Sequence, residues 1–371
     1  MRNAYLLFSG LLLAACSDNS TADGNGIFVS TPVASFDEPW AMSFLPDGRL
    51  LVTEKKGRLI LVTQDGVKSA PIAGVPDVDY GGQGGFGDVV LHPGYASNGL
   101  VYISYVEAGE GNTRGAAVAR ATLSLTVSGG SLNDLEVIWR QHPKVKGKGH
   151  YGHRIAFSQD GYLYISSGER KKFDPAQDMN ANLGKIVRLY PEGSVPDDNP
   201  FADRGGVTAE IWSLGHRNPL GIAFDEQGRL WNIEMGPRGG DELNLVVRGE
   251  NYGYPIVSNG RHYSGRDIPD HDTRPEFAEP KVWWTPVISP GGLLFYTGDL
   301  FPDWQGDALI PGLTAKAVIR VEIDGDSARE SARFDMGKRI RAIRQGPNGA
   351  IWLLEDRRGG RLLKLTPSVG G

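Results

Sequence analysis

Asp160-Gly161-Tyr162-Leu163-Tyr164-Ile165 is the stretch that decides the fold, because it sets a tight turn directly before a short run of alternating apolar residues. An Asp-Gly pair tolerates the positive φ that a tight hairpin turn demands, so a β-strand is expected after it. Arg154-Ile155-Ala156-Phe157 alternates in the same way and would form the partner strand. Five further copies of the turn and strand begin at Asp47, Asn98, Gln227, Gln305 and Asn348. Repeated small antiparallel sheets are typical of a propeller, so we predict an all-β fold, a six-bladed β-propeller of four-stranded antiparallel blades.

The predicted propeller is a single catalytic domain over residues 27–371, since no segment there shows sustained helical periodicity and no domain boundary interrupts it. A strand at Gly26 to Val33 is expected to close the ring against the last blade. The longest interval between copies must hold an extra loop, Asn251 to Pro286, which is dense in Gly, Pro, Tyr and Asp. Insertions in repeat proteins collect on one face, often the binding face, so this loop predicts an active-site face.

The composition fits a folded protein with many turns. The chain has 371 residues, of which 40% are apolar, and it contains 51 glycines and 23 prolines. A formal net charge of −5 provides no basic field for a phosphate backbone, so no nucleic-acid partner is expected.

The N-terminus is predicted to be a targeting segment. Residues 1–16 combine a positive start at Arg2, a short apolar run and Leu13-Ala14-Ala15-Cys16, which resembles a bacterial lipobox. Cys16 would then be lipidated, residues 17–26 would be a flexible tether, and the protein would sit on the periplasmic side of a bacterial membrane, lipid-anchored (at the outer membrane) or periplasmic. Only that lipid anchor would touch the membrane. A cytosolic chain with an apolar N-terminus is the alternative.

Gly149-His150-Tyr151-Gly152-His153-Arg154 crowds two imidazoles and a guanidinium onto a loop before a strand. Loops held by a rigid sheet are where reactive groups usually sit, so His150 is the candidate chemical centre. The alternative is a polar loop that closes a turn.

Two further loops carry candidate ligand-binding groups. Gln83 lies in a glycine-rich run that lacks the Gly-Lys-Ser/Thr ending of a phosphate loop, and its glycines would let backbone approach a flat ligand. Arg217 and Asn218 lie side by side before Pro219, where they could hold a carboxylate or a quinone oxygen. A flexible turn and a solvated charge are the respective alternatives.

Gly236-Pro237-Arg238-Gly239-Gly240-Asp241-Glu242-Leu243-Asn244 offers carbonyls, two carboxylates and an amide, which are the hard oxygen ligands that calcium prefers. An acidic turn without metal is the alternative. Arg339 and Arg341 alternate on one strand face, where two guanidiniums repel unless an anion lies between them. This favours a polycarboxylate ligand, with a solvated edge strand as the alternative.

Together the motifs resemble the glucose/sorbosone dehydrogenases that use pyrroloquinoline quinone (PQQ), and within them the soluble aldose sugar dehydrogenase branch. The resemblance covers nearly all of the chain after the N-terminal segment. The matching motifs, in family order, are Gly81-Gly82-Gln83-Gly84-Gly85, the His-x-Gly-x-Arg of His150 to Arg154, Arg217-Asn218-Pro219, Gly236 to Glu242, and Asn251-Tyr252-Gly253.

The resemblance implies a six-bladed propeller that oxidises aldoses at the anomeric carbon to lactones, by hydride transfer to PQQ. His150 would be the general base and Arg217 would stabilise charge on the reacting quinone oxygen. Gln83 and Asn218 would hold the cofactor. The partners implied are an aldose sugar and an external electron acceptor, and a homodimer is left open.

The remaining roles also come from the resemblance. The carbonyls of Gly236 and Pro237 would bind the calcium that sits on PQQ, acting as a Lewis acid. Glu242 and the backbone of Tyr252 match positions of a second, structural calcium. The cofactor set is completed by Arg339 and Arg341, which would pair with PQQ carboxylates, by Trp284, which would flank the cofactor plane, and by Lys316.

Two departures from the family pattern stand out. Leu313-Thr314 replaces a leucine-lysine pair, leaving Lys316 as the nearest lysine, and Gly149 replaces the aspartate that precedes the catalytic histidine in the soluble glucose dehydrogenases. The group that orients His150 is therefore not given by the sequence. A propeller that only binds a ligand, and a calcium-dependent hydrolase without a redox cofactor, are the competing functions.

Overall fold

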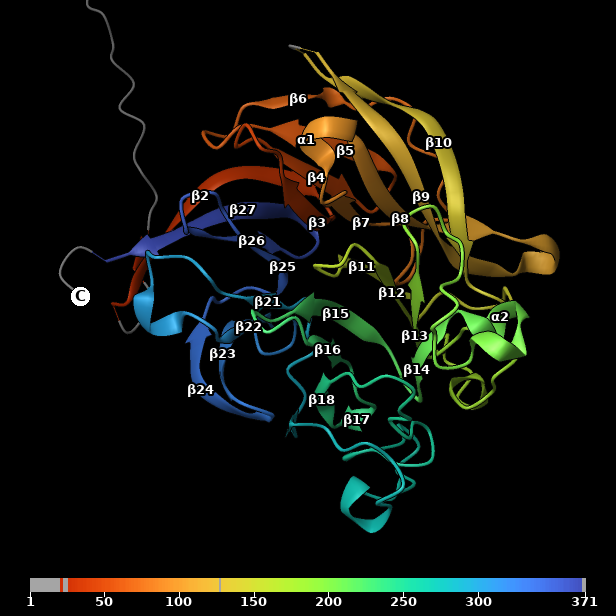
Figure 1. The fold of residues 1–371 in the computed structure, drawn as a ribbon. Coiled ribbons are helices and arrows are strands. Elements are labelled where there is room, and N and C mark those ends of the chain that lie inside the picture. Colours follow the sequence, from red (N-terminus) through yellow and green to blue (C-terminus); the bar gives the residue numbers. More distant parts are fainter. Residues whose placement is uncertain (1–20, 23–25, 127, 369–371) are drawn as a thin grey trace, which may run out of the picture.

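The computed structural model describes residues 21–22, 26–126 and 128–368. Six antiparallel blades stand in a ring, five of them four-stranded sheets and the sixth a four-stranded blade with one further short strand at its edge, so the predicted six-bladed β-propeller is confirmed (Figure 1). Helices in the described part are short: α1 spans Tyr95–Asn98, α2 spans Gly206–Ala209, and the rest are three-residue 3₁₀ turns. None of these helices is long and apolar enough to cross a membrane.

The first three blades follow the chain strand by strand. The first holds β3 (Pro39–Phe44), β4 (Leu50–Glu54), β5 (Arg58–Val62) and β6 (Lys68–Pro71). The second holds β7 (Phe86–Leu91), β8 (Leu100–Ala108), β9 (Arg114–Leu125) and β10 (Gly130–Arg140). The third holds β11 (Gly152–Phe157), β12 (Leu163–Ser167), β13 (Lys185–Leu189) and β14 (Ile211–Leu214).

The last three blades include an insertion and the closure of the ring. The fourth holds β15 (Pro219–Phe224), β16 (Leu230–Glu234), β18 (Asp241–Leu245) and β20 (Val282–Trp284). The fifth holds β21 (Leu294–Phe295), β22 (Ala308–Pro311), β23 (Ala317–Asp324) and β24 (Ser327–Asp335). The sixth joins β25 (Ile340–Gln345), β26 (Ile351–Glu355) and β27 (Arg358–Pro367) to β2 (Phe28–Asp37) from the other end of the chain.

The six repeated glycine turns all connect the first and second strands of a blade. Their glycines have φ between 64° and 90°, a conformation that other residues rarely adopt; they are Gly48, Gly99, Gly161, Gly228, Gly306 and Gly349. Because strands alternate in direction, these turns share one face of the ring. The second-to-third turns and the links between blades therefore lie on the opposite face.

The ring is closed by β2, which pairs antiparallel with β27 and confirms the predicted closing strand. Part of the predicted tether is also sheet, since β1 (Thr21–Ala22) pairs with Ser30 and Val29 of β2. These two residues of the predicted tether can pair in this way because free backbone groups on the edge of β2 can accept another strand. Cys16 lies outside the described residues.

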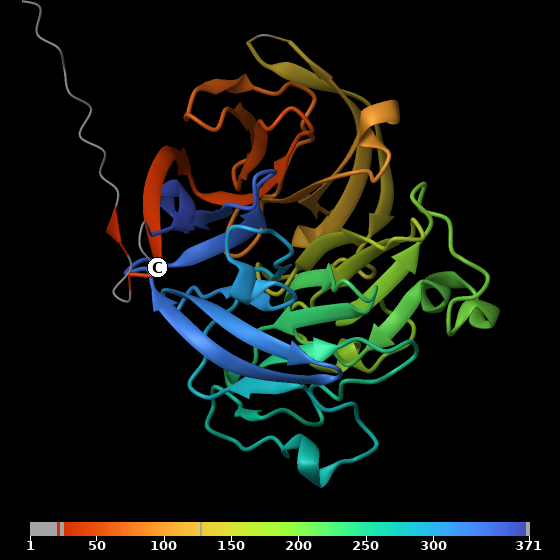
Figure 2. The ribbon, with the colours of Figure 1, turned by 60° about the vertical axis from the view of Figure 1, so that its left-hand side comes forward.

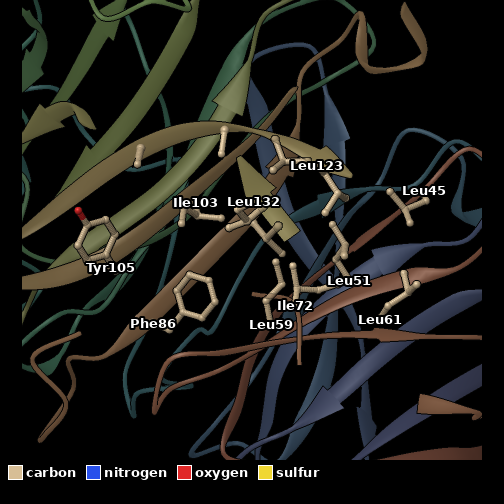
Figure 3. Packing of buried hydrophobic residues seen from close by; sticks show 14 of the residues in the cluster. Leu45, Leu51, Leu59, Leu61, Ile72, Phe86, Ile103, Tyr105, Leu123 and Leu132 are labelled. Atoms are coloured by element: carbon tan, nitrogen blue, oxygen red, sulfur yellow. The ribbon is translucent and has the colours of Figure 1, made fainter. Parts of the chain in front are cut away.

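Figures 1 and 2 show the blades side by side around the ring, and the main clusters of buried apolar residues each join two neighbouring blades. Figure 3 shows Leu51 and Leu59 of the first blade packed with Phe86 and Ile103 of the second, all at most 1% exposed. Burying one such side chain contributes about 1.5–3 kcal/mol, so this packing fixes the blades relative to one another.

Arg154, the last residue of the His-x-Gly-x-Arg motif, contacts residues of several different blades. Its guanidinium pairs with Asp88 of β7 at 3.2 Å and donates to the carbonyls of Leu220 at 2.8 Å and Gly291 at 2.5 Å. It also lies 3.7 Å from the ring centroid of Trp40. Arg154 thus connects several blades, which is a structural role.

The predicted extra loop, Asn251 to Pro286, includes β20, and the part of it before β20 belongs to the connection from β18 and projects beyond the ring (Figure 1). Within it, β19 (Gly260–Arg261) pairs with β17 (Arg238–Gly239), which belongs to the second-to-third turn of the fourth blade. Although the insertion links a third strand to a fourth, this pairing carries it to the face opposite the repeated glycine turns.

Candidate functional site

Two hollows lie on the face opposite the repeated glycine turns, where second-to-third turns and blade-to-blade links meet. The first has a volume of about 280 Å³, and the second about 560 Å³. The first is lined by four of the predicted cofactor-binding residues: Gln83, Asn218, Arg339 and Arg341. The second is lined by three others: His150, Arg217 and Pro237. Since Arg217 and Asn218 are adjacent in the chain, the two hollows share a wall.

His150 is held by backbone and side chain alike. Its N–H donates to Oε1 of Gln83 at 2.6 Å, and its carbonyl accepts from the N–H of Arg170 at 3.1 Å. Nδ1 is hydrogen-bonded to Oε1 of Glu169. Burial lowers the pKa of His150 to about 4, with Arg217 acting in the same direction and the bond to Glu169 opposing it. The imidazole is therefore neutral near pH 7 and can accept a proton.

Glu169 is the orienting group that the sequence did not reveal. Its Oε2 accepts the backbone N–H of Lys172 and, at 2.8 Å, that of Phe173. Burial alone raises the pKa of Glu169, but its bonds to His150 and to the Phe173 amide lower it overall. The carboxylate is an acceptor only, so Nδ1 of His150 carries the hydrogen and Nε2 is left as the proton acceptor. The sequence did contain a signal for this contact. His150 lies just before β11 and Glu169 just after β12, and these two strands form an antiparallel hairpin, so the two residues lie at the same end of it.

Arg217 and Asn218 bridge the two hollows. Nη1 of Arg217 donates to the carbonyls of Met235 at 2.7 Å and Gly236 at 2.5 Å. Nε of Arg217 and Oδ1 of Asn218 are buried and have no hydrogen-bond partner. Buried polar atoms in native structures are nearly always paired, so these two atoms point to a missing ligand.

Arg339 and Arg341 do lie together, but the anion between them belongs to the chain. Oδ2 of Asp356 accepts from Nε of Arg339 at 2.8 Å, and Oδ1 accepts from Nη2 of Arg341 at 2.9 Å. The repulsion between the two guanidiniums is thus relieved within the chain and gives no separate support for a polycarboxylate ligand, but both side chains line the first hollow. Lys55 and Arg357 line it as well, so its wall remains cationic.

Two predicted cofactor residues lie elsewhere. Trp284 is buried in the core between the fourth and fifth blades, and its Nε1 donates to Glu330 at 2.6 Å. Lys316 is exposed on the turn between β22 and β23. Neither lines either hollow, because the pairing of β20 turns Trp284 into the core and the short turn holds Lys316 outward. Leu313 does line the first hollow.

His153 has a different environment from His150. Its ring stacks on Trp40 with centroids 4.8 Å apart, and its Nδ1 is bonded to Oγ of Ser104 at 2.8 Å. Burial lowers the pKa of His153 to about 3. This imidazole forms part of the wall of the first hollow and has no carboxylate to orient it.

The predicted calcium ligands occupy two neighbouring places. Gly236 lies in the chain between Met235, which lines the first hollow, and Pro237, which lines the second, and Asp241 holds this loop by accepting the Gly236 N–H at 2.8 Å. Glu242 is buried; burial and the nearby charges of Glu234 and Asp241 raise its pKa well above the ordinary range. The carbonyl of Tyr252 is bonded to Nε2 of His271 at 3.2 Å. Within the described ranges, no three His, Cys, Asp or Glu side chains are grouped to hold a metal.

The geometry can be compared with known proteins. A family model described as glucose/sorbosone dehydrogenase matches residues 36–364. The aldose sugar dehydrogenase of Escherichia coli (strain K12) is 41% identical over 339 residues, covering 89% of this chain and 90% of the relative. The apo-form crystal structure of the soluble aldose sugar dehydrogenase of E. coli is 40% identical, covers 91% and 99% of the two chains, and has a TM-score of 0.86. The PQQ-bound aldose sugar dehydrogenase of Streptomyces coelicolor is 29% identical, with coverages of 91% and 96% and a TM-score of 0.76.

Proposed function

Because this chain belongs to the glucose/sorbosone dehydrogenase family, we propose that it is a PQQ-dependent dehydrogenase that oxidises aldose sugars at C1 to lactones. The observation that carries the proposal is the neutral His150 imidazole, fixed by Glu169, at a hollow that shares a wall with a cationic one.

The first hollow suits a flat anion such as PQQ. Its wall combines cationic side chains with the stacked rings of Trp40 and His153, and the buried Oδ1 of Asn218 lacks a partner there. Guanidiniums pair with carboxylates, and flat rings pack against other flat ring systems. The residues proposed to hold PQQ are Gln83, Asn218, Arg339 and Arg341, with Lys55 and Arg357 added from the structure.

The second hollow holds the protein side chains that are proposed to take part in the reaction. When bound, PQQ would accept the hydride from C1 of the sugar. His150 Nε2 would take the hydroxyl proton, and Glu169 would hold the imidazole in the tautomer that leaves Nε2 free. Arg217, fixed by two carbonyls, lines the second hollow and brings a positive charge to it, where negative charge would be stabilised.

Calcium is part of the proposal, and the donor chemistry supports it. Gly236 follows Met235 of the first hollow and precedes Pro237 of the second, and the carbonyls of Gly236 and Pro237 are the donors proposed to bind a calcium ion that would act as a Lewis acid. Glu242 is buried among like charges, which a divalent cation would relieve, and the Tyr252 carbonyl would complete that second, structural site.

The partners and location remain proposals that rest on the family and on the N-terminal sequence. We propose an external electron acceptor, and anchoring through lipid on Cys16 at the periplasmic side of the membrane.

A dye-coupled assay tests the function. Protein purified without cofactor should reduce the dye with glucose only after PQQ and calcium are added, and its visible spectrum should gain the bound quinone band. A binding module would gain the band without turnover. A hydrolase would act on its substrate without PQQ. Either result would overturn the proposal.

A further inference from the structure

The second hollow is lined by cations that the described carboxylates do not pair with. Lys171 and Arg266 both line it, and neither forms an ion pair with a carboxylate among the described residues. In that same part of the chain, the side chain of Arg266 has one polar side-chain contact, with Nε2 of His262 at 3.4 Å. Both cations are exposed and reach the hollow from different segments, the turn after β12 and the insertion before β20.

The acidic residues of this hollow offset only part of that charge. Its lining holds two carboxylates, of which Glu169 is already engaged by His150 and by two backbone N–H groups, so the exposed Asp174 is left to face the cations. Arg217 adds a third cation to the same wall. The local field is visible in His262: burial lowers its pKa, and the charges of Arg266 and Arg217 lower it further.

Aromatic rings gather beside the cations. The ring of Phe173 lies 6.4 Å from that of Tyr254 and 5.8 Å from that of His262, measured between centroids. Tyr263 extends the surface outward and is 74% exposed. Such a wall suits the apolar C–H face of a sugar ring. The volume of about 560 Å³ falls within the usual range for ligand pockets and is twice that of the first hollow.

We propose that the second hollow selects aldoses that carry a carboxylate, such as hexuronic acids, through Lys171 and Arg266. The inference rests on the proposed function and names its substrate class. Oxidation would still occur at C1: hydride leaves carbon for the oxidised cofactor, the hydroxyl proton passes to His150, and C1 becomes the lactone carbonyl. The sugar carboxylate is unchanged and only binds.

Glucose and glucuronate form a matched pair, because they differ only in carrying CH₂OH or a carboxylate at C6. We expect the holoenzyme, assayed with an uncharged acceptor, to show a kcat/KM about 10-fold higher for glucuronate. Lys171→Gln and Arg266→Gln should each lower the glucuronate-to-glucose ratio about 3-fold, the size of an exposed ion pair, and together about 10-fold. Lys146→Gln removes an exposed cation near the His150 loop that lines neither hollow, and should leave the ratio as in wild type.

Binding without turnover gives a second measurement. Methyl glucuronide and methyl glucoside have no free hydroxyl at C1, so calorimetry on the holoenzyme reports their affinity alone. The glucuronide should bind more tightly, and 0.5 M salt should reduce the difference by screening.

Four outcomes decide the inference. Equal kcat/KM for the two sugars in wild type overturns it while the proposed function stands. A ratio that Lys171→Gln and Arg266→Gln leave unchanged also overturns it. If these variants instead raise only the KM of an anionic acceptor, the cations serve the acceptor and the inference is wrong. No oxidation of either sugar by PQQ-loaded wild type overturns the proposed function, and the inference with it.

Discussion

Nδ1 of His150 is hydrogen-bonded to Oε1 of Glu169, a carboxylate nineteen residues further along the chain. The pairing fixes which nitrogen faces the second hollow. His153, three positions after His150, is buried against Trp40 and Ser104 instead. Two histidines in one motif thus have different tasks, one proposed to be chemical and the other to be structural.

His150→Ala should lower kcat for glucose about 10²- to 10⁴-fold, the usual contribution of a positioned base, while PQQ still binds. His153→Ala should keep far more activity but lower the melting temperature, because a buried stacked ring is removed. Steady-state kinetics, a PQQ titration and thermal melting check this. A dead His153→Ala beside a nearly normal His150→Ala would mean that the base is assigned to the wrong imidazole.

The rate should depend on pH through His150. Burial holds the pKa of His150 near 4, so kcat/KM should be level from neutral pH to about 5 and fall below about 4 as the base is protonated. The ordinary pKa is 6.5, so between these values the unfolded chain binds the extra proton, and stability is lost as the pH falls through this window.

Glu169→Gln should move the acid-side fall of kcat/KM to lower pH, because the mutation removes the negative charge that raises the pKa of His150. It should also lower kcat about 10- to 100-fold by loosening the imidazole. A pH profile of kcat/KM for both proteins is the measurement. An unchanged profile and rate would remove Glu169 from the mechanism.

The cationic wall of the first hollow should govern cofactor affinity. Replacing Arg339 and Arg341 together by Gln should weaken PQQ binding about 10-fold or more, since each guanidinium can pair with a carboxylate. Arg358→Gln is the control, because that side chain is 75% exposed and lines neither hollow. Fluorescence titration with PQQ distinguishes them, and equal affinities would place the cofactor elsewhere.

Calcium should stabilise the protein through Glu242. A ligand bound only by the folded state raises stability by mass action, so chelation should lower the melting temperature and added calcium should restore it. Glu242→Gln should remove this response, whereas Glu250→Gln, an exposed carboxylate nearby, should preserve it. A wild-type melting temperature indifferent to chelator and calcium would contradict the site.

Cys16→Ser should release the protein from the membrane into the soluble periplasmic fraction, because the cysteine is the proposed lipid attachment point. Several acyl chains hold a protein firmly, whereas one gives only marginal binding. Fractionation and mass spectrometry of the mature N-terminus check this. Soluble wild type with an unmodified Cys16 would exclude the anchor.

Much of the fold could be predicted because its signals are local. Asp160-Gly161 and its counterparts mark hairpins whose glycines must adopt positive φ, and their number equals the number of blades. Ring closure by β2 was also predicted. The short β1 was not, because two residues carry no periodicity.

Some residues of the site could likewise be predicted from the sequence, and others could not. Gln83, His150, Arg217 and Asn218 could be named because they lie in compact motifs, and the structure brings them to two adjoining hollows. Asp356 could not be foreseen as the partner of Arg339 and Arg341, because it approaches them only through the pairing of β25 with β26. Trp284 lies away from both hollows for a similar reason: strand pairing, which the sequence does not show, turns its ring into the core.

The sequence by itself determined the family, the number of blades and the residue types of the site, since turn chemistry and short motifs depend on neighbouring residues alone. Only the tertiary structure decided that Glu169 orients His150, that two hollows share a wall, and that Lys171 and Arg266 face one of them. Hydrogen bonds, burial and charge act across space, so their partners are fixed only once the ring has closed and loops from different blades meet on one face.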